Sequence, residues 1–275
     1  MEPVIWRGMT RAQLDAAYNN TAAVKNSAEK LADWTARSER LRREKPELLD
    51  LAYGPKPRNR IDIFKSGRTN APLFVFVHGG YWQRNNKEIF ACMAEGPLAH
   101  GLDVATIGYT LAPEATLTEI VAEVRSAMAW LHASGPQHGV GANKIIVSGW
   151  SAGGHLTAMA LDLADAGLAI SGVFDIEPCR MNYLDEKLRL TEEETLNLSP
   201  ARQLPKMSKP LTVTFGEAEL PELQRQSRDY HAARIAARLP SALLPLAGHD
   251  HFSILEELAK PEGKLAGIVA ALAGV

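Results

Sequence analysis

The feature that most constrains the fold of this chain is a regular alternation of short apolar runs with longer amphipathic stretches. The run Leu73–Val77 contains no polar residue, which is typical of a strand buried on both faces. Strands that alternate with helices of this length form βαβ units, so we expect a mainly parallel sheet flanked by helices. Further strands are predicted at 103–107, 144–148, 170–174, 211–215 and 242–246, and helices at 87–100, 118–134, 154–164, 223–239 and 253–274.

The N-terminal part of the chain has a different pattern. Its first 50 residues are rich in Ala, Leu, Glu, Lys and Arg, and Thr10 is a candidate N-cap, which predicts two or three helices. Segment 60–65 then alternates polar and apolar residues, as an edge strand does. Segment 185–209 is acidic and then rich in proline, which suggests a surface insertion. Without an internal repeat or linker, we expect one α/β domain at 51–275 preceded by a helical segment at 1–50.

Composition excludes several classes of function. The 30 basic and 32 acidic residues give a net charge of −2 with no basic tail, so nucleic acid is not an expected partner. Cys92 and Cys179 are too few for a disulfide framework or a cysteine zinc site, and buried reduced thiols fit the cytoplasm. The N-terminus does not resemble a signal peptide, and the apolar stretch at 265–275 is about half a membrane span. We therefore expect a cytoplasmic protein without a membrane partner.

The strongest functional signal is Gly149-Trp150-Ser151-Ala152-Gly153, which follows a predicted strand and precedes a predicted helix. This is the G-x-S-x-G nucleophile elbow in the structural context that the motif requires. The turn strains the serine backbone and leaves no room for bulky neighbours, which explains the glycines. Ser151 is therefore the predicted nucleophile, with a helix N-terminus directed at the charge that develops during the reaction.

A glycine pair follows the strand Leu73–Val77, in the sequence His78-Gly79-Gly80-Tyr81-Trp82. In hydrolases with this elbow, one oxyanion donor comes from the residue after the nucleophile and the other from this loop. The loop Gly79–Tyr81 is thus the predicted oxyanion loop. Its backbone N–H groups at Gly80 and Tyr81 would act together with that of Ala152, while His78 braces the loop.

The base and the acid should follow the nucleophile along the chain. His249 and His251 come after the last predicted strand, where a base belongs, and chain order leaves both open. His155 and His231 lie in predicted helices and are less suited. The acid should follow strand 211–215; Glu219 has room to reach the imidazole, and the remaining candidates are Glu217, Glu222 and, after strand 170–174, Asp175.

With these residues assembled, the chain resembles the α/β-hydrolases of the kynurenine formamidase (arylformamidase) and small carboxylesterase group. The resemblance rests on four segments: 78–83, 151–156, 219–227 and 250–252. It selects Glu219 as the acid and His251 as the base, and it makes the N-terminal helices a short cap over the site. The chain departs from the family at Glu219, where Asp is common, and at Trp150, where His is common. Both departures leave the mechanism intact but bear on the substrate.

The expected chemistry is acyl transfer through an acyl-enzyme, which needs no cofactor. A metal is not expected either, because no cluster of His, Cys, Asp and Glu has ligand spacing. Tyr18, Trp82 and Trp150 are candidate walls of a pocket for a small ester or amide. A carboxylesterase for aryl or short acyl groups is the broader expectation, and an N-formylkynurenine-type arylformamidase is the sharper alternative. A more distant alternative is a non-catalytic ligand receptor that has a hydrolase fold and has kept the serine elbow. The number of subunits is open, a homodimer being one option.

Overall fold

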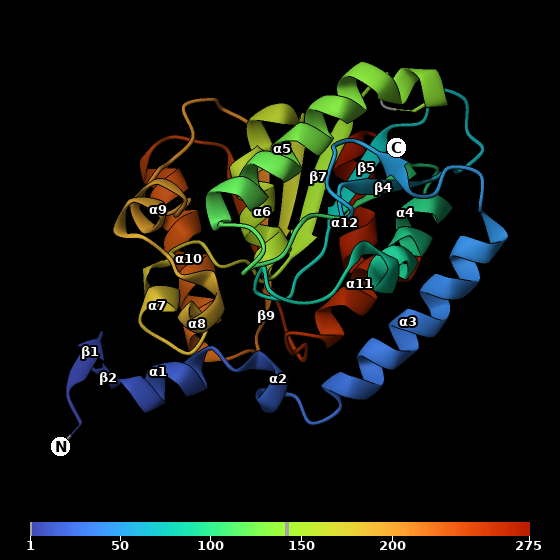
Figure 1. Cartoon of the computed structure of the whole chain (residues 1–275). Coiled ribbons are helices and arrows are strands. Elements are labelled where there is room, and N and C mark those ends of the chain that lie inside the picture. Colours follow the sequence, from blue (N-terminus) through green and yellow to red (C-terminus); the bar gives the residue numbers. More distant parts are fainter. Residues whose placement is uncertain (1, 141–142) are drawn as a thin grey trace.

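An eight-stranded sheet forms the centre of the computed structural model, which describes residues 2–140 and 143–275 (Figure 1). Its strand order is β10-β9-β8-β7-β5-β6-β4-β3. Strands β5 to β10 pair in parallel, whereas β4 is antiparallel to β6 and β3 is antiparallel to β4. The strands are β3 (Leu51–Ala52), β4 (Arg60–Phe64), β5 (Leu73–Val77), β6 (Asp103–Ile107), β7 (Ile145–Trp150), β8 (Ala166–Ile170), β9 (Leu211–Gly216) and β10 (Ser241–Leu246). The α/β-hydrolase fold predicted from the sequence is confirmed.

The two faces of the sheet carry separate apolar cores, because successive side chains of a strand point to opposite sides. In β5, Leu73, Val75 and Val77 face one core, and Phe74 and Phe76 face the other. Helices α5 (Leu117–Ser134), α6 (Ala152–Ala160) and α10 (Pro221–Ala236) cover the first face. The 3₁₀ helix η1 (Lys87–Ala94) covers the second face together with α3 (Ser27–Glu44), α4 (Glu95–Ala99), α11 (Glu256–Ala259) and α12 (Lys264–Ala273).

Two of the predicted strands differ in the structure. The strand predicted at 170–174 is found at Ala166–Ile170 as β8, and residues 171–174 form a loop that begins with Ser171 at a positive φ of 51°. Segment 60–65 does form β4, but this strand is not at the edge, since β3 pairs with its outer side. Its polar residue Asp62 is fully buried, where it accepts a hydrogen bond from Lys87 Nζ at 2.7 Å and pairs with Arg42 of α3. The alternating pattern therefore reflects a buried ion pair rather than a solvent-exposed face.

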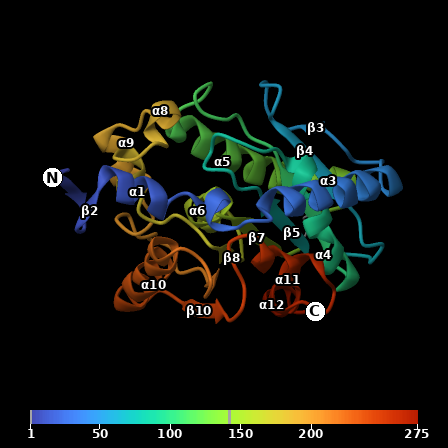
Figure 2. The same cartoon turned by 90° about the horizontal axis from the view of Figure 1, so that it is seen from below.

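The N-terminal segment lies across the carboxyl end of the parallel strands (Figure 2). A hairpin of β1 (Val4–Trp6) and β2 (Met9–Thr10) leads into α1 (Arg11–Ala17), followed by α2 (Asn20–Ala23) and α3. Thr10 is the N-cap of α1 as predicted and forms a capping box with Gln13. The hairpin itself was not expected from the sequence.

Trp34 attaches α3 to the rest of the molecule. Its fully buried ring stacks on Phe252, with 6.1 Å between the ring centroids, and meets Trp150 edge-on at 6.0 Å. Its indole N–H donates to the Glu256 carboxylate at 2.7 Å. Arg37, one turn further along α3, binds the same carboxylate and that of Glu95. Helix α3 is thus fixed beside the carboxyl end of β7.

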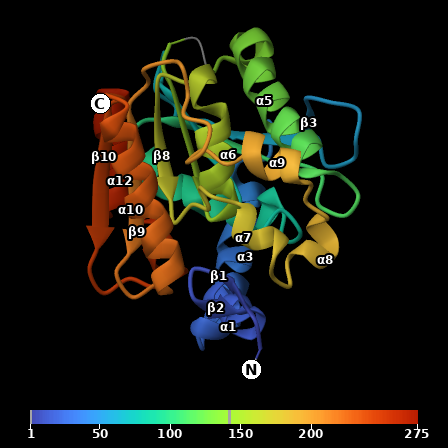
Figure 3. The same cartoon turned by 90° about the vertical axis from the view of Figure 1, so that its left-hand side faces the viewer.

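The segment predicted as a surface insertion is only partly exposed. It contains α8 (Asp185–Leu188) and α9 (Glu192–Asn197), which follow α7 (Glu177–Arg180) and lie between α5 and the N-terminal segment (Figure 3). Leu188 and Thr195 are buried there, and Glu194 accepts hydrogen bonds from Thr118 at the start of α5. Among the described residues, no helix is both long and apolar enough to cross a bilayer.

Candidate active site

Ser151 lies at the carboxyl end of β7, at the turn into α6. Its backbone has φ +58° and ψ −117°, a combination that a non-glycine residue adopts only under strain. The turn is held because the Ser151 N–H donates to the Ile170 carbonyl of β8 at 2.8 Å. A methyl group at Gly153 would collide with the Val77 carbonyl of β5, so the turn requires glycine there. The backbone at Ser151 therefore has the conformation of the nucleophile elbow predicted from the sequence.

The loop after β5 brings further backbone N–H groups to the same place. Gly80 has φ +122°, which only glycine adopts readily. Among the hydrogen bonds of the described residues, none uses the N–H of Gly80 or Tyr81. Ala152 is the first residue of α6, where backbone N–H groups lack helical partners. Three donors suited to an oxyanion are therefore without an intramolecular partner in this part of the chain.

The predicted oxyanion loop is held in place by side chains on both of its flanks. The Gly79 carbonyl accepts hydrogen bonds from His78 Nδ1 at 2.9 Å and from Asn85 Nδ2 at 3.2 Å. The Tyr81 hydroxyl donates to the Tyr18 carbonyl at 2.7 Å and accepts from Asn20 Nδ2 at 2.9 Å. Burial raises the pKa of Tyr81 well above its usual value, so this hydroxyl stays neutral. The loop is consequently tied to the N-terminal segment.

Glu219 and His251 are brought together by the loops that follow β9 and β10. His251 Nδ1 lies 2.8 Å from Glu219 Oε2, and both side chains are almost completely buried. The other carboxylate oxygen, Oε1, accepts hydrogen bonds from Ser171 Oγ at 2.6 Å and from the Gly216 N–H at 2.7 Å. This arrangement fixes the imidazole with its Nε2 free to face the cavity beside Ser151.

The alternative acids and bases lie elsewhere. His249 is directed at the Ser253 carbonyl and, at 3.5 Å, at the Glu257 carboxylate. Glu217 is exposed, and Asp175 pairs with Arg202 at 2.9 Å. Glu222 binds Arg225. None of these residues contacts His251 through a hydrogen bond in the described chain.

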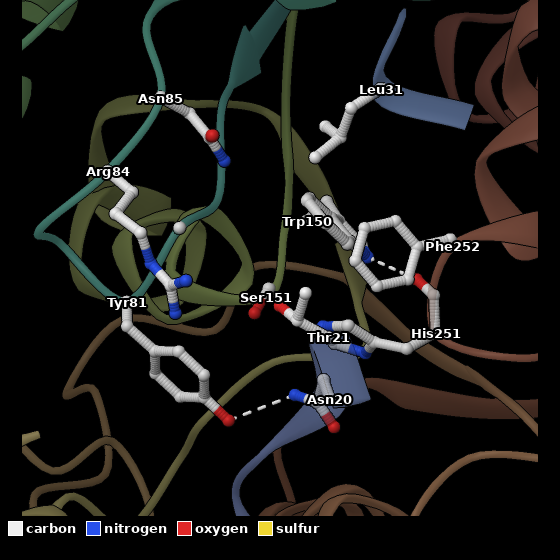
Figure 4. A pocket seen from close by; sticks show the side chains of 11 residues that line it. Asn20, Thr21, Leu31, Tyr81, Arg84, Asn85, Trp150, Ser151, His251 and Phe252 are labelled. Carbon is white, nitrogen blue, oxygen red and sulfur yellow. Dashed lines mark hydrogen bonds between the residues drawn. The ribbon is translucent and has the colours of Figure 1, made fainter. Parts of the chain in front are cut away.

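Ser151 and His251 line one cavity of about 140 Å³ at the carboxyl end of the sheet (Figure 4). No hydrogen bond joins the Ser151 hydroxyl to the imidazole among the described residues. Such contacts are often loose before substrate binds and tighten in the reacting complex. The other residues that line the cavity are Asn20, Thr21, Leu31, Gly80, Tyr81, Arg84, Asn85, Trp150 and Phe252.

Of the three aromatic residues predicted as pocket walls, one lines the cavity and two do not. Trp150 lines the cavity, and its indole N–H donates to the His251 carbonyl at 2.7 Å. Tyr18 and Trp82 do not line it, because both are fully buried in the core. The Tyr18 hydroxyl accepts from Gln226 at 2.6 Å, and the Trp82 ring packs edge-on against His155. Trp82 was predicted from its place beside the oxyanion loop and Tyr18 from its place in the N-terminal helices, but both side chains point into the core.

Two further histidines near the site have structural roles. His78 stacks on Tyr109 with 4.3 Å between the ring centroids, and His155 Nε2 lies 2.7 Å from the Leu198 carbonyl. Burial lowers the pKa of each imidazole to about 4, so both are neutral near pH 7. His231, on α10, contacts the Ser241 hydroxyl and does not line the cavity.

Sequence reasoning missed several residues at the site. Ser171 was missed because the sequence placed it inside a strand predicted at 170–174, whereas it directly follows β8 and its hydroxyl donates to Glu219. Asn20, Thr21 and Leu31 reach the cavity from the N-terminal segment, whose placement no local pattern indicates. In the part of the chain that the structure describes, no group of three or more His, Cys, Asp or Glu is arranged to hold a metal ion.

Comparison with known proteins links this geometry to a family. A family profile described as BD-FAE matches residues 61–166. Kynurenine formamidase of Danio rerio is 28% identical over 92% of this chain and 93% of its own length. Kynurenine formamidase of Drosophila melanogaster is 30% identical over 76% of both chains. The crystal structure of a proposed thioesterase from a Silicibacter species has a TM-score of 0.83 and 29% identity over 94% of this chain and 98% of its own.

Proposed function

This chain belongs to the kynurenine formamidase and esterase group of the α/β-hydrolases and is a hydrolase of ester or amide bonds, and on that premise we propose that Ser151, His251 and Glu219 form its catalytic triad. The observation that carries the proposal is the 2.8 Å hydrogen bond between His251 and the buried Glu219, beside a cavity that His251 shares with Ser151.

In the proposed reaction, His251 Nε2 takes the proton of the Ser151 hydroxyl as the serine oxygen attacks the substrate carbonyl. Glu219 keeps Nδ1 protonated and stabilises the imidazolium. The N–H groups of Gly80, Tyr81 and Ala152 bind the oxyanion of the tetrahedral intermediate. His251 then protonates the leaving group, and water releases the acyl group from Ser151.

The size of the cavity supports a small acyl group. At about 140 Å³ it is well below the roughly 300 Å³ at which drug-sized ligand pockets begin. Leu31, Trp150 and Phe252 provide an apolar side that suits an aryl or short alkyl group. We therefore propose a carboxylesterase activity on short acyl or aryl esters as the general function.

A second candidate is the hydrolysis of an aryl formamide of the N-formylkynurenine type. It is favoured by the name of two relatives, which match most of this chain at 28% and 30% identity. A formyl group is the smallest acyl group and needs no acyl pocket beyond the oxyanion loop. In this case the leaving group would occupy the cavity.

The experiment compares kcat/KM for p-nitrophenyl acetate and for N-formylkynurenine, using the full chain and the Ser151→Ala variant. A formamidase should favour the formamide by orders of magnitude, and a general esterase should favour the activated ester. Either activity should fall by a factor of about 10⁶ in Ser151→Ala.

Labelling by a fluorophosphonate tests the nucleophile directly. The wild-type chain should be labelled at Ser151 and the Ser151→Ala variant should not. If the wild type resists the reagent and cleaves neither substrate, the chain is a ligand receptor with a hydrolase fold, and the proposed function is wrong.

A further inference from the structure

Arg84 gives the cavity a positive charge that nothing in its walls balances. The side chain extends from the oxyanion loop toward Ser151 and Tyr81 (Figure 4). The cavity is lined by this one arginine and by no aspartate or glutamate. Among the salt bridges of the described residues, none includes Arg84. By contrast, Arg58 donates to the Asn85 carbonyl, and Lys87, three residues after Arg84, pairs with Asp62.

The carboxylate of Glu219 is already engaged by other groups. Glu219 lies behind His251, and its two oxygens accept hydrogen bonds from Ser171, Gly216 and His251. It is 5% exposed and does not line the cavity. An arginine stays charged at any physiological pH, so the cavity offers a permanent cation to what enters it.

The backbone beneath Arg84 is fixed relative to the reacting groups. The Arg84 N–H donates to the Gly80 carbonyl at 3.0 Å, which closes the turn that carries the oxyanion donors. The next residue, Asn85, has φ +73° and bonds the Gly79 carbonyl. The backbone of Arg84 is therefore tied to the loop that carries the oxyanion donors, and its side chain lines the cavity beside them.

The opposite wall is apolar. Leu31, Trp150 and Phe252 face the cavity together, and Trp150 packs against Phe252 with 5.3 Å between the ring centroids. A substrate that satisfies both walls has an apolar body and an anionic group. Guanidinium binds carboxylate through two parallel hydrogen bonds, which makes a carboxylate the anion of choice.

We propose that Arg84 is a specificity-determining residue that binds a carboxylate on the substrate, so the preferred ester or amide carries an apolar group and a carboxylate. This proposal rests on the proposed function, because it assigns a substrate class to the same site. The carboxylate belongs either to the leaving group or to the acyl group, and the test separates these two sources.

The test measures kcat/KM for two matched pairs. For a carboxylate on the leaving group, 4-acetoxybenzoate is compared with phenyl acetate. For a carboxylate on the acyl group, 4-nitrophenyl hemisuccinate is compared with 4-nitrophenyl pentanoate. In each pair, the ratio of the anionic to the neutral substrate is determined for the wild type, Arg84→Gln, Arg84→Lys and Arg68→Gln. Arg68 is exposed on the surface outside the cavity, so Arg68→Gln matches the change in net charge.

We expect the ratio of one pair to fall about tenfold to a hundredfold in Arg84→Gln, as loss of a charge-assisted hydrogen bond predicts. It should fall less in Arg84→Lys and remain unchanged in Arg68→Gln. In the wild type, the same ratio should decline as ionic strength rises toward about 1 M. The substrate pair whose ratio falls shows whether the carboxylate belongs to the leaving group or to the acyl group.

Unchanged ratios in both pairs of Arg84→Gln would overturn the proposal, as would an equal fall in Arg68→Gln. Inhibition of phenyl acetate hydrolysis by benzoate gives an independent readout, because its inhibition constant should rise about tenfold in Arg84→Gln. Neutral-ester turnover that disappears in Ser151→Ala upholds the proposed function even if Arg84 has no effect. Turnover that survives Ser151→Ala refutes the proposed function instead.

Discussion

Three donors converge on the carboxylate of Glu219, from Ser171, Gly216 and His251. Replacing Glu219 by Gln keeps the shape but puts an amide where the imidazole needs an acceptor, so His251 would lose its fixed tautomer. We expect kcat for the ester to fall by about 10²- to 10⁴-fold, by analogy with the serine protease triad. Steady-state kinetics measure this change.

Glu217→Gln is the matched control, because Glu217 is exposed and only two residues away. It should alter kcat by less than about twofold, as expected for a surface substitution that contacts nothing in the site. An equal loss in the two variants, or full activity in Glu219→Gln, would rule out Glu219 as the acid.

At the scale of single residues, the sequence indicated the site residues that belong to motifs. It missed those that only the fold brings to the cavity. Ser151 and Gly80 lie in patterns tied to a sharp turn, and such turns can be recognised locally. The choice between His249 and His251 depends on the course of a loop, and the resemblance rather than the spacing decided it. Arg84 and Thr21 reach the cavity from loops and from the N-terminal segment, for which local sequence has no signal.

At the scale of elements, α3 depends on Trp34 for its position. We expect Trp34→Ala to lower the free energy of unfolding by about 3–5 kcal/mol, because the fully buried ring would leave a cavity between Phe252 and Trp150. Urea denaturation measures this loss. Trp130→Ala is the control, since Trp130 on α5 is only partly buried and should cost less than half as much. Similar losses would show that α3 is not fixed in this way.

Substitution by alanine is expected to have opposite effects on stability at two glycines that lie in helices. Gly153 in α6 approaches the Val77 carbonyl of β5, so Gly153→Ala must separate the helix from the sheet and abolish folding or activity. Gly267 in α12 has open space around its α-carbon, so Gly267→Ala should raise the free energy of unfolding by about 0.5–1 kcal/mol. Thermal denaturation and ester hydrolysis distinguish the two, and a tolerated Gly153→Ala would contradict the close approach.

Element boundaries were predictable where a run of apolar residues ends in a turn. β5, β6 and β9 follow that rule. β8 was placed four residues late, because the apolar residues continue past Ile170 although pairing with β7 and β9 ends there. The terminal helix was predicted unbroken over 253–274 but divides at 260–263, where Pro261 cannot continue α11.

At the scale of the whole molecule, stability depends on pH through His78 and His155. Burial holds the pKa of each at about 4, below the ordinary 6.5. Between these values the unfolded chain binds more protons than the folded one, so the free energy of unfolding falls as pH decreases. The loss is about 2 kcal/mol per histidine between about pH 7 and pH 5.

Urea denaturation at about pH 7 and pH 5 measures this dependence, above the range in which most carboxylates take up protons. In His155→Gln the drop on acidification should shrink by about 2 kcal/mol. His132→Gln, on the surface of α5, should retain the full drop. A pH-independent wild type would mean that neither imidazole is kept neutral by burial.

The bond between the Trp150 indole and the His251 carbonyl has a consequence for spectroscopy. Trp150 is the tryptophan that lines the cavity among the described residues, and its ring centroid lies 4.9 Å from that of His251. The contribution of Trp150 to the emission of the five tryptophans therefore responds to whatever displaces water from the cavity and to charge on the imidazole. The protein carries its own optical probe, so ligands that are never turned over can be titrated without a label.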